Sequence, residues 1–364
     1  MATEESRALV ISGWSAASPY GLGREAFGAG LRSGRTALAP LDRRAWPGPY
    51  DTAGLIPDFD VRAVLGKKGT RAMDRVTGIA VVTLGMLLER YEPGLGEDPE
   101  RVGLVLGSSG SVQSIMDFTR DALTGEKPYH VDPALFPNTV LNRPAGQSAI
   151  RYGLKGPNTT LSGGAPTGLL ALNYASRLLR RGHAALLLCG AVEEYSPQRA
   201  RLAWAASREA TPEPLGEGGA LFVLERAAGA RAAGRPVLAR VAASRFRAFT
   251  APDRAGAALA HCVEDVLRET GTAPGDVTLV APSQPPGPLG KQEAAALTET
   301  VGDRAERLCT RPLLGDAYAA AAAFQTAAVL SAAEDRAAPA ALITSVDPDS
   351  GVGCTLLTGV GGRP

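Results

Sequence analysis

The sequence predicts a layered α/β fold built from two similar halves. Short apolar runs that are typical of buried strands alternate with longer segments of helical periodicity along the whole chain. The longest apolar runs, such as Ala184–Val192, have the length of a strand. We expect one half over residues 1–233 and a second, shortened half over residues 234–364. A chain of 364 residues is long enough to bury a large core.

The first half alternates strand-like runs with helices around one unusual turn. Strands are predicted at Ala8–Trp14, Arg101–Ser109, His183–Glu194 and Gly218–Arg226, and helices at Arg24–Ser33, Met73–Tyr91 and Val112–Leu123. The stretch Leu161–Gly168 (LSGGAPTG) indicates a tight turn that leads from a further strand into a further helix. Many α/β enzymes hold a nucleophile at such a junction. Here the middle of the turn reads Gly-Gly-Ala-Pro and offers none.

The second half repeats the same style in fewer residues. The Ala- and Arg-rich passage Ala227–Val241 could be a linker, but its pattern favours a helix that leads straight into a strand. Further helices are predicted at Ala255–Thr270, residues 291–302 and Ala317–Glu334, and further strands at residues 277–282, 341–346 and 354–360. The two halves therefore share one layered plan.

Composition excludes several classes of function. The chain carries 38 basic and 37 acidic residues, so there is no overall charge that would favour nucleic acid or an anionic membrane. No run approaches the roughly 20 apolar residues that span a bilayer. The N-terminal residues, MATEESRALVISG, place two glutamates where a signal peptide has its basic region. We expect a cytoplasmic protein without membrane or nucleic-acid partners.

The cysteines and histidines do not predict a metal site. The four cysteines form no Cys-x-x-Cys pair, and no histidine pattern lies near them. Cys189 and Cys309 end apolar runs and are predicted to be small buried hydrophobic residues. We therefore expect no metal, no disulfide framework and no cofactor.

Four segments together resemble the β-ketoacyl synthases, the condensing enzymes of fatty-acid and polyketide assembly. They are residues 10–23 (VISGWSAASPYGLG), Ile56–Arg75, Phe136–Glu194 and Gly216–Glu225, and the similarity extends over most of the chain. The resemblance implies the thiolase fold, in which two related α/β halves stack as five layers, α-β-α-β-α. It also implies pairing through a dimer interface.

The positions that carry the family's chemistry are changed. The resemblance places the acyl-accepting cysteine at Ala165 and the two histidines at Ser283 and Asp316, while the family's lysine is replaced by Arg311. Segments 208–219 and 349–354 also depart from the family pattern. The chain's own histidines lie elsewhere, at His130, His183 and His261. The resemblance therefore implies that ordinary condensing activity is absent.

One branch of the family fits this loss. The chain most resembles the chain-length factor of type II polyketide synthases, a subunit that lacks the cysteine. Such a subunit pairs with a Cys-bearing ketosynthase, is served by an acyl carrier protein, and shapes the tunnel for the growing polyketide or polyene chain. Alone it is not expected to be an enzyme. Two alternatives remain: an independent acyltransferase that uses Ser283 or Asp316, and a scaffold that docks carrier proteins.

The resemblance places the tunnel along the helix predicted at Val112–Leu123. Gln113, Met116 and Arg120 share one face of this helix, and Phe118 lies on the neighbouring face. These four residues are the predicted tunnel residues. Alternatively, Met116 and Phe118 are core or interface residues. Arg120 is an awkward tunnel residue because burying an unpaired guanidinium is costly, and it could instead face a carboxylate of the partner.

Overall fold

The computed structural model describes residues 7–91, 98–127, 130–207, 212–349 and 351–361. Residues 208–211 and 350 belong to the two segments that depart from the family pattern and lie outside the described residues. Among the described residues, no helix combines the length and apolar character that a membrane span requires.

The described strands form one long mixed sheet composed of two equivalent sets. The first set has the order β1-β8-β7-β5-β6 and the second the order β9-β13-β12-β10-β11. In each set the first two neighbouring pairs are antiparallel and the last two are parallel. The sets join where Val10 and Ile11 pair with Arg240 and Ala239. This repeated order confirms the two related halves.

The bounds of the strands are as follows. The first set contains β1 (Leu9–Ser18), β5 (Val102–Gly107), β6 (Asn158–Leu161), β7 (Leu186–Glu193) and β8 (Gly218–Arg226), with the short β2 (Gly21–Leu22) on β1. The second contains β9 (Ala239–Arg247), β10 (Val277–Ala281), β11 (Glu306–Arg307), β12 (Ala338–Asp347) and β13 (Gly351–Val360). A separate hairpin pairs β3 (Ala39–Pro40) with β4 (Thr52–Ala53).

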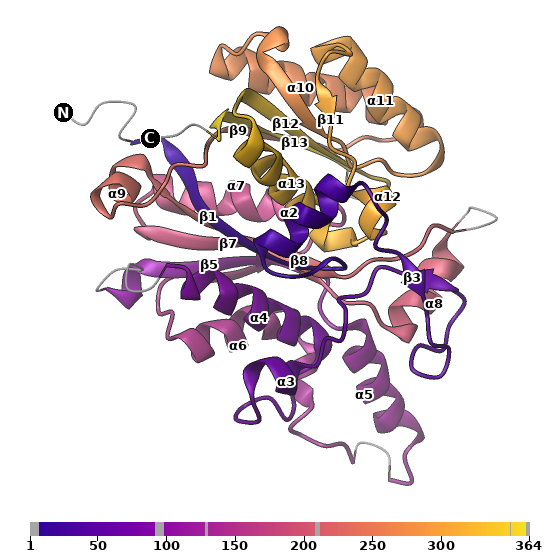
Figure 1. Cartoon of the computed structure of the whole chain (residues 1–364). Helices are drawn as coiled ribbons and strands as arrows, with labels where there is room; N and C mark the ends of the chain where they lie inside the picture. The colour runs from indigo at the N-terminus through magenta and orange to yellow at the C-terminus, as the bar shows by residue number, and fades with distance from the viewer. Residues whose placement is uncertain (1–6, 92–97, 128–129, 208–211, 350, 362–364) are drawn as a thin grey trace.

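Helices lie on both faces of each set and produce the five layers seen in Figure 1. Helices α10 (Ala255–Thr270) and α11 (Gly287–Val301) cover the outside of the second set, and α4 (Arg75–Glu89) and α6 (Arg143–Tyr152) cover the outside of the first. Helices α7 (Thr167–Arg180) and α13 (Ala321–Asp335) lie between the sets, and α13 contacts strands of both. Its apolar residues are buried all round, as this middle position requires. The α-β-α-β-α thiolase fold is thereby confirmed.

The remaining helices surround these layers. They are α2 (Arg24–Ser33), α3 (Val61–Leu65), α5 (Val112–Thr124), α8 (Pro197–Ala206), α9 (Ala227–Ala232) and α12 (Arg311–Leu314), together with short 3-10 turns that include η2 (Phe136–Thr139) and η5 (Tyr318–Ala320).

The structure agrees with most predicted elements and shifts a few of their ends. Helices α2 and α10 and strand β8 begin and end at the predicted residues. The passage predicted as helix followed by strand forms α9 and β9. The helix predicted from Ala317 begins only at Ala321, because residues 318–320 form a 3-10 turn around Tyr318, whose φ of 41° is left-handed.

Candidate functional site

The turn before α7 keeps the shape of a nucleophile elbow. Gly164 has a φ of 66°, the left-handed region that favours glycine, and a Cβ on Gly163 would meet Leu170 at 2.6 Å. The Thr167 hydroxyl accepts a hydrogen bond from the Gly163 N–H at 2.9 Å and donates one to the Gly164 carbonyl at 2.6 Å. The Gly-Gly pair and Thr167 therefore fix the turn independently of the residue at its centre.

That central residue, Ala165, is sealed by a carboxylate from the other half of the chain. Its side chain is only 6 % exposed, and its backbone N–H donates to Oδ2 of Asp347 at 2.8 Å. Asp347 is the last residue of β12 and is itself buried; its Oδ1 accepts the N–H of Asp349 at 2.9 Å. An anion at the start of a helix is electrostatically favourable. The elbow therefore has no nucleophile, and its central N–H is already used by a protein anion.

Ser283, at the second degenerate position, is buried after β10 and fully hydrogen-bonded. Its hydroxyl donates to Oε1 of Glu293 at 2.8 Å and accepts the N–H of Val346 at 3.0 Å. Glu293 also accepts the Ser283 N–H and the Thr344 hydroxyl. Burial raises the pKa of Glu293, and these hydrogen bonds partly offset the rise. The Ser283 hydroxyl has no free role in chemistry.

Asp316, at the third position, is part of a partly buried ion pair between α12 and η5. Arg311 Nη2 lies 3.1 Å from Asp316 Oδ2, and Asp316 Oδ1 accepts the Tyr318 N–H at 2.9 Å. Burial alone would raise the pKa of Asp316, but the charges of Arg311 and Arg199 outweigh it and the pKa is lowered. The pKa of Arg311 is raised in turn: burial lowers it, but Asp316 and Glu213 outweigh burial. Asp316 is thus an ionised structural carboxylate.

The degenerate positions adjoin one another around the end of β12. Ala165 binds Asp347 and Ser283 binds Val346, the residue before it. Tyr318 lies close enough to Asp347 and Asp316 that, after burial, these carboxylates raise its pKa. Buried and paired carboxylates therefore surround the positions at which the resemblance places a thiolate and two imidazoles. The negative electrostatic potential of these carboxylates disfavours an oxyanion that develops during a reaction.

The four predicted tunnel residues separate into two pairs on α5. Gln113 and Phe118 line a cavity of about 260 Å³, together with Asp74, Asn138 and Glu194. Met116 and Arg120 do not line this cavity and are exposed. The guanidinium of Arg120 pairs with carboxylates of its own helix, Asp117 and Asp121, each at 3.0 Å. The cost foreseen for a buried, unpaired Arg120 therefore does not arise.

Sequence reasoning missed the acidic residues of this cavity. Burial, with the nearby Asp74 charge, raises the pKa of Glu194 to about 8. Burial also raises the pKa of Asp74, and Oδ1 of the buried Asn138 has no hydrogen-bond partner within the described segments. The only sequence signal was the pair of glutamates at the end of a buried strand.

The described part of the chain offers no arrangement suited to a metal ion. Across the residues that the structure describes, no group of three or more His, Cys, Asp or Glu side chains could hold one. All four cysteines are free thiols, and Cys189 is buried as predicted. Cys309 is only partly buried, contrary to the prediction, because it lines a cavity beneath α11.

Comparison with known proteins identifies the family. The sequence model of the β-ketoacyl synthase N-terminal domain matches residues 6–230, and that of the C-terminal domain matches residues 237–344. The chain belongs to the β-ketoacyl synthase family. This confirms the resemblance on which the degenerate positions were assigned.

Individual β-ketoacyl synthases match along almost the whole chain. A Streptomyces halstedii protein described by name as polyketide beta-ketoacyl synthase 2 is 31% identical over 359 residues, covering 92% of this chain and 86% of the relative. The 3-oxoacyl-[acyl-carrier-protein] synthase 2 of Coxiella burnetii is 27% identical and covers 95% of this chain and 90% of the relative.

Solved structures agree with the sequence comparison. The ishigamide ketosynthase/chain length factor matches with a TM-score of 0.89 at 40% identity, covering 97% of this chain and 100% of that one. A β-ketoacyl synthase from Burkholderia phymatum has a TM-score of 0.85 at 19% identity, covering 97% of this chain and 100% of that one, which shows the shared fold.

Proposed function

We propose that this chain is a non-catalytic, chain-length-determining subunit that pairs with a Cys-bearing ketosynthase. The observation that carries the proposal is the turn at Ala165. This residue supplies no nucleophile, and its backbone N–H already donates a hydrogen bond to Asp347. The hydrogen-bonded Ser283 and the paired Asp316 leave no other reagent at the site. The same contacts argue against an independent acyltransferase built on these two residues.

An exposed apolar face supports an obligate partner. The elements α5, η2, α6 and α8 contact one another in part, and each presents exposed hydrophobic side chains. We call this the apolar face: Ile115, Met116, Leu123, Phe136, Val140, Ile150, Leu202 and Trp204. Clusters of this kind usually mark protein interfaces. β6, the edge strand of the sheet, belongs to the same half and offers an unpaired edge to the partner.

The cavity lined by Gln113 and Phe118 supports a role in measuring chain length. It lies on α5, the helix whose exposed side belongs to the apolar face. An acyl chain that crosses from the partner subunit would meet these two side chains first. Bulk at this point limits how far the chain extends. The growing chain arrives on an acyl carrier protein; one solved relative of the same fold shows a type II polyketide synthase carrier protein in complex with its ketosynthase.

Co-expression with a ketosynthase that keeps its cysteine and both histidines tests the proposal. We expect a stable 1:1 heterodimer, in which only the partner's cysteine is acylated. Phe118→Ala should lengthen the product, whereas Thr124→Ala, at an exposed position on the same helix outside both the cavity and the apolar face, should not. A chain that stays a monomer or homodimer beside every candidate partner contradicts the proposal. A heterodimer whose product length no α5 variant alters would indicate the scaffold alternative.

A further inference from the structure

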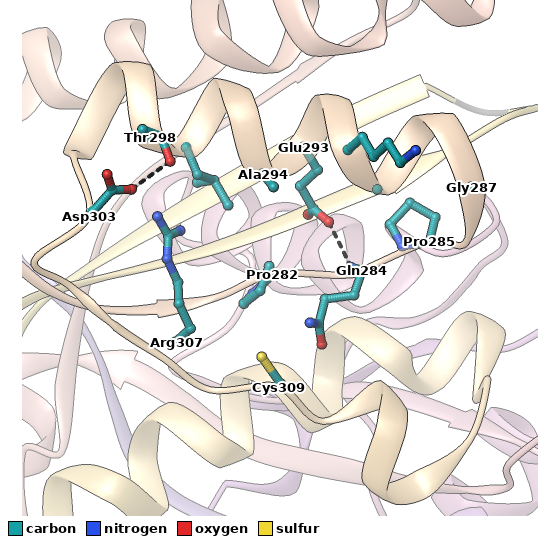
Figure 2. Close-up of a pocket in the computed structure, with 13 residues that line it drawn as sticks. Pro282, Gln284, Pro285, Gly287, Glu293, Ala294, Thr298, Asp303, Arg307 and Cys309 are labelled. Atoms are coloured by element: carbon teal, nitrogen blue, oxygen red, sulfur yellow. Dashed lines mark hydrogen bonds between the residues drawn. The ribbon is translucent and has the colours of Figure 1, made fainter.

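A further cavity in the described part of the chain shares no lining residue with the elbow or with the cavity of Gln113 and Phe118. It has a volume of about 510 Å³ and lies between α11 and the loops that follow β10 and β11 (Figure 2). This volume falls within the range of sites for small organic molecules, about 300–1,000 Å³. No role in condensation or in chain-length control explains it.

Two polar atoms at this cavity are buried and have no hydrogen-bond partner among the residues that the structure describes. They are Oε1 of Gln284 and Nη1 of Arg307, and both residues line the cavity. Leaving such a group unsatisfied destabilises the fold, and a charged group more so than a neutral one. One atom is an acceptor and the other a cationic donor, so a single ligand with complementary groups would satisfy both.

Gln284 is held at the cavity by a strained backbone. Its φ is 52°, a left-handed value that is uncommon outside glycine. Glu293 stabilises this conformation, because its Oε2 accepts the Gln284 N–H at 2.7 Å while its Oε1 binds Ser283 (Figure 2). Strain of this kind persists only where surrounding contacts impose it, and it often occurs at ligand sites.

Charges of both signs line the cavity, and the two carboxylates already accept hydrogen bonds from within the protein. Glu293 is fully occupied by its own hydrogen bonds, and Asp303 accepts the Thr298 hydroxyl at 2.7 Å. Arg307 and Lys291 line the cavity as cations, and Arg307 reaches toward α11 from the opposite wall (Figure 2). The rest of the wall is largely apolar and includes Leu297.

We propose that this cavity binds a small organic anion with an apolar body and a hydrogen-bond donor. Its carboxylate or phosphate group would pair with Arg307 and Lys291, since guanidinium groups bind such anions through charge-assisted hydrogen bonds. Its donor would reach Oε1 of Gln284, and its apolar part would contact Leu297. The site is separate from the proposed tunnel and does not depend on a partner subunit.

Cys309 provides a reporter inside the cavity. It is the one cysteine of the four that is not fully buried, and it contacts Gln284. We compare its rates of reaction with 5,5′-dithiobis(2-nitrobenzoate), an aromatic carboxylate, and with the uncharged 4,4′-dithiodipyridine, using the purified full chain. Cys309→Ser gives the background. Arg307→Gln should lower the ratio of the two rates about tenfold, equivalent to about 1.4 kcal/mol of lost attraction.

The ratio isolates the anion effect. Arg307 also lowers the thiol pKa of Cys309, but a change in that pKa alters both rates alike. Arg304→Gln, at an exposed position three residues away, is the matched control and should leave the ratio unchanged. A ratio that Arg307→Gln does not change, or that Arg304→Gln lowers equally, overturns the proposal. The dithiodipyridine rate and the melting temperature verify that the variants fold.

Ligand protection gives an independent measurement. We expect millimolar 3-(4-hydroxyphenyl)propionate, whose phenol supplies the donor, to slow the labelling of Cys309 by dithiodipyridine at least threefold, and the uncharged 3-(4-hydroxyphenyl)propionamide to have little effect. Loss of this protection in Arg307→Gln supports the site. Equal protection by the two compounds, or none by either, refutes an anion site.

Discussion

Restoring the missing cysteine should not restore a reactive thiolate. In Ala165→Cys the new thiol would lie at the start of α7, where helix N–H groups normally favour a thiolate. Here the N–H of residue 165 already donates to Asp347, 2.8 Å away. The carboxylate therefore removes a stabilising donor and adds a like charge.

The size of this effect follows from the geometry. A cysteine Sγ lies about 3 Å from its own backbone nitrogen, so it would lie within about 6 Å of Oδ2 of Asp347. Two unit charges at that distance repel by about 2.8 kcal/mol at an effective dielectric constant of about 20. This raises the thiol pKa by about two units, from about 8.5 to about 10.5.

The pH dependence of alkylation by iodoacetamide measures this pKa, in a Cys309→Ser background that removes the other accessible thiol. We expect a midpoint near pH 10.5 for Ala165→Cys, and one about two units lower when Asp347→Asn is added. The Asn side chain can still accept the N–H, so the comparison isolates the charge. Asp349→Asn, at an exposed neighbouring position, is the control and should shift the midpoint far less. A midpoint below pH 8 with Asp347 intact would refute the reasoning.

Three further predictions follow from burial and pairing. Glu194 has a pKa raised to about 8 in the folded chain, so the folded state keeps a proton that the unfolded state loses above its ordinary pKa, near 4.5. The free energy of unfolding should therefore fall by up to about 1.4 kcal/mol per pH unit between these values. Measured by urea denaturation at pH 5 to 8, this fall with pH should be smaller in Glu194→Gln. Arg311→Ala leaves the carboxylates of Glu213 and Asp316 without their partner and should lower the free energy of unfolding in urea by about 3–5 kcal/mol. A smaller loss of stability in Arg311→Ala/Asp316→Ala than in Arg311→Ala alone would confirm the coupling of the pair. Additive losses would contradict it. Ile150→Glu changes a 77 % exposed position of the apolar face. It should raise the dissociation constant of the heterodimer at least tenfold in sedimentation experiments without lowering the melting temperature. An unchanged dissociation constant would place the interface elsewhere.

The fold could be predicted from the sequence wherever local signals determine it. The glycine after α10, Gly271, is left-handed, as a helix C-cap favours, and Asp74 caps the start of α4 through the Thr77 N–H. Such signals involve neighbouring residues and can be recognised in a single sequence. The degenerate positions could also be assigned from the sequence, because the family resemblance extends through them.

The contacts of the site could not be predicted in the same way. Asp347 lies 182 residues from Ala165, and no periodicity relates the end of one strand to a turn in the other half. The cavity beneath α11 was missed for the same reason, because its walls come from separate loops and contain no motif. On α5, helical spacing grouped Gln113 with Met116 and Arg120, whereas in the structure Gln113 lines the cavity together with Phe118.

The losses at the elbow are compensated, and this explains why the shape of the site persists without its chemistry. Thr167 and Gly164 hold the turn, Asp347 satisfies its central N–H, and Ser283 satisfies the carboxylate of Glu293 that also positions the β10 loop. These hydrogen bonds leave the central N–H of the turn and the carboxylate of Glu293 paired, so neither group adds the cost of an unsatisfied buried polar atom. The elbow is better understood as a structural element whose hydrogen bonds support α7 in the middle layer of the fold, and under the proposed function the reacting thiol would belong to the partner subunit.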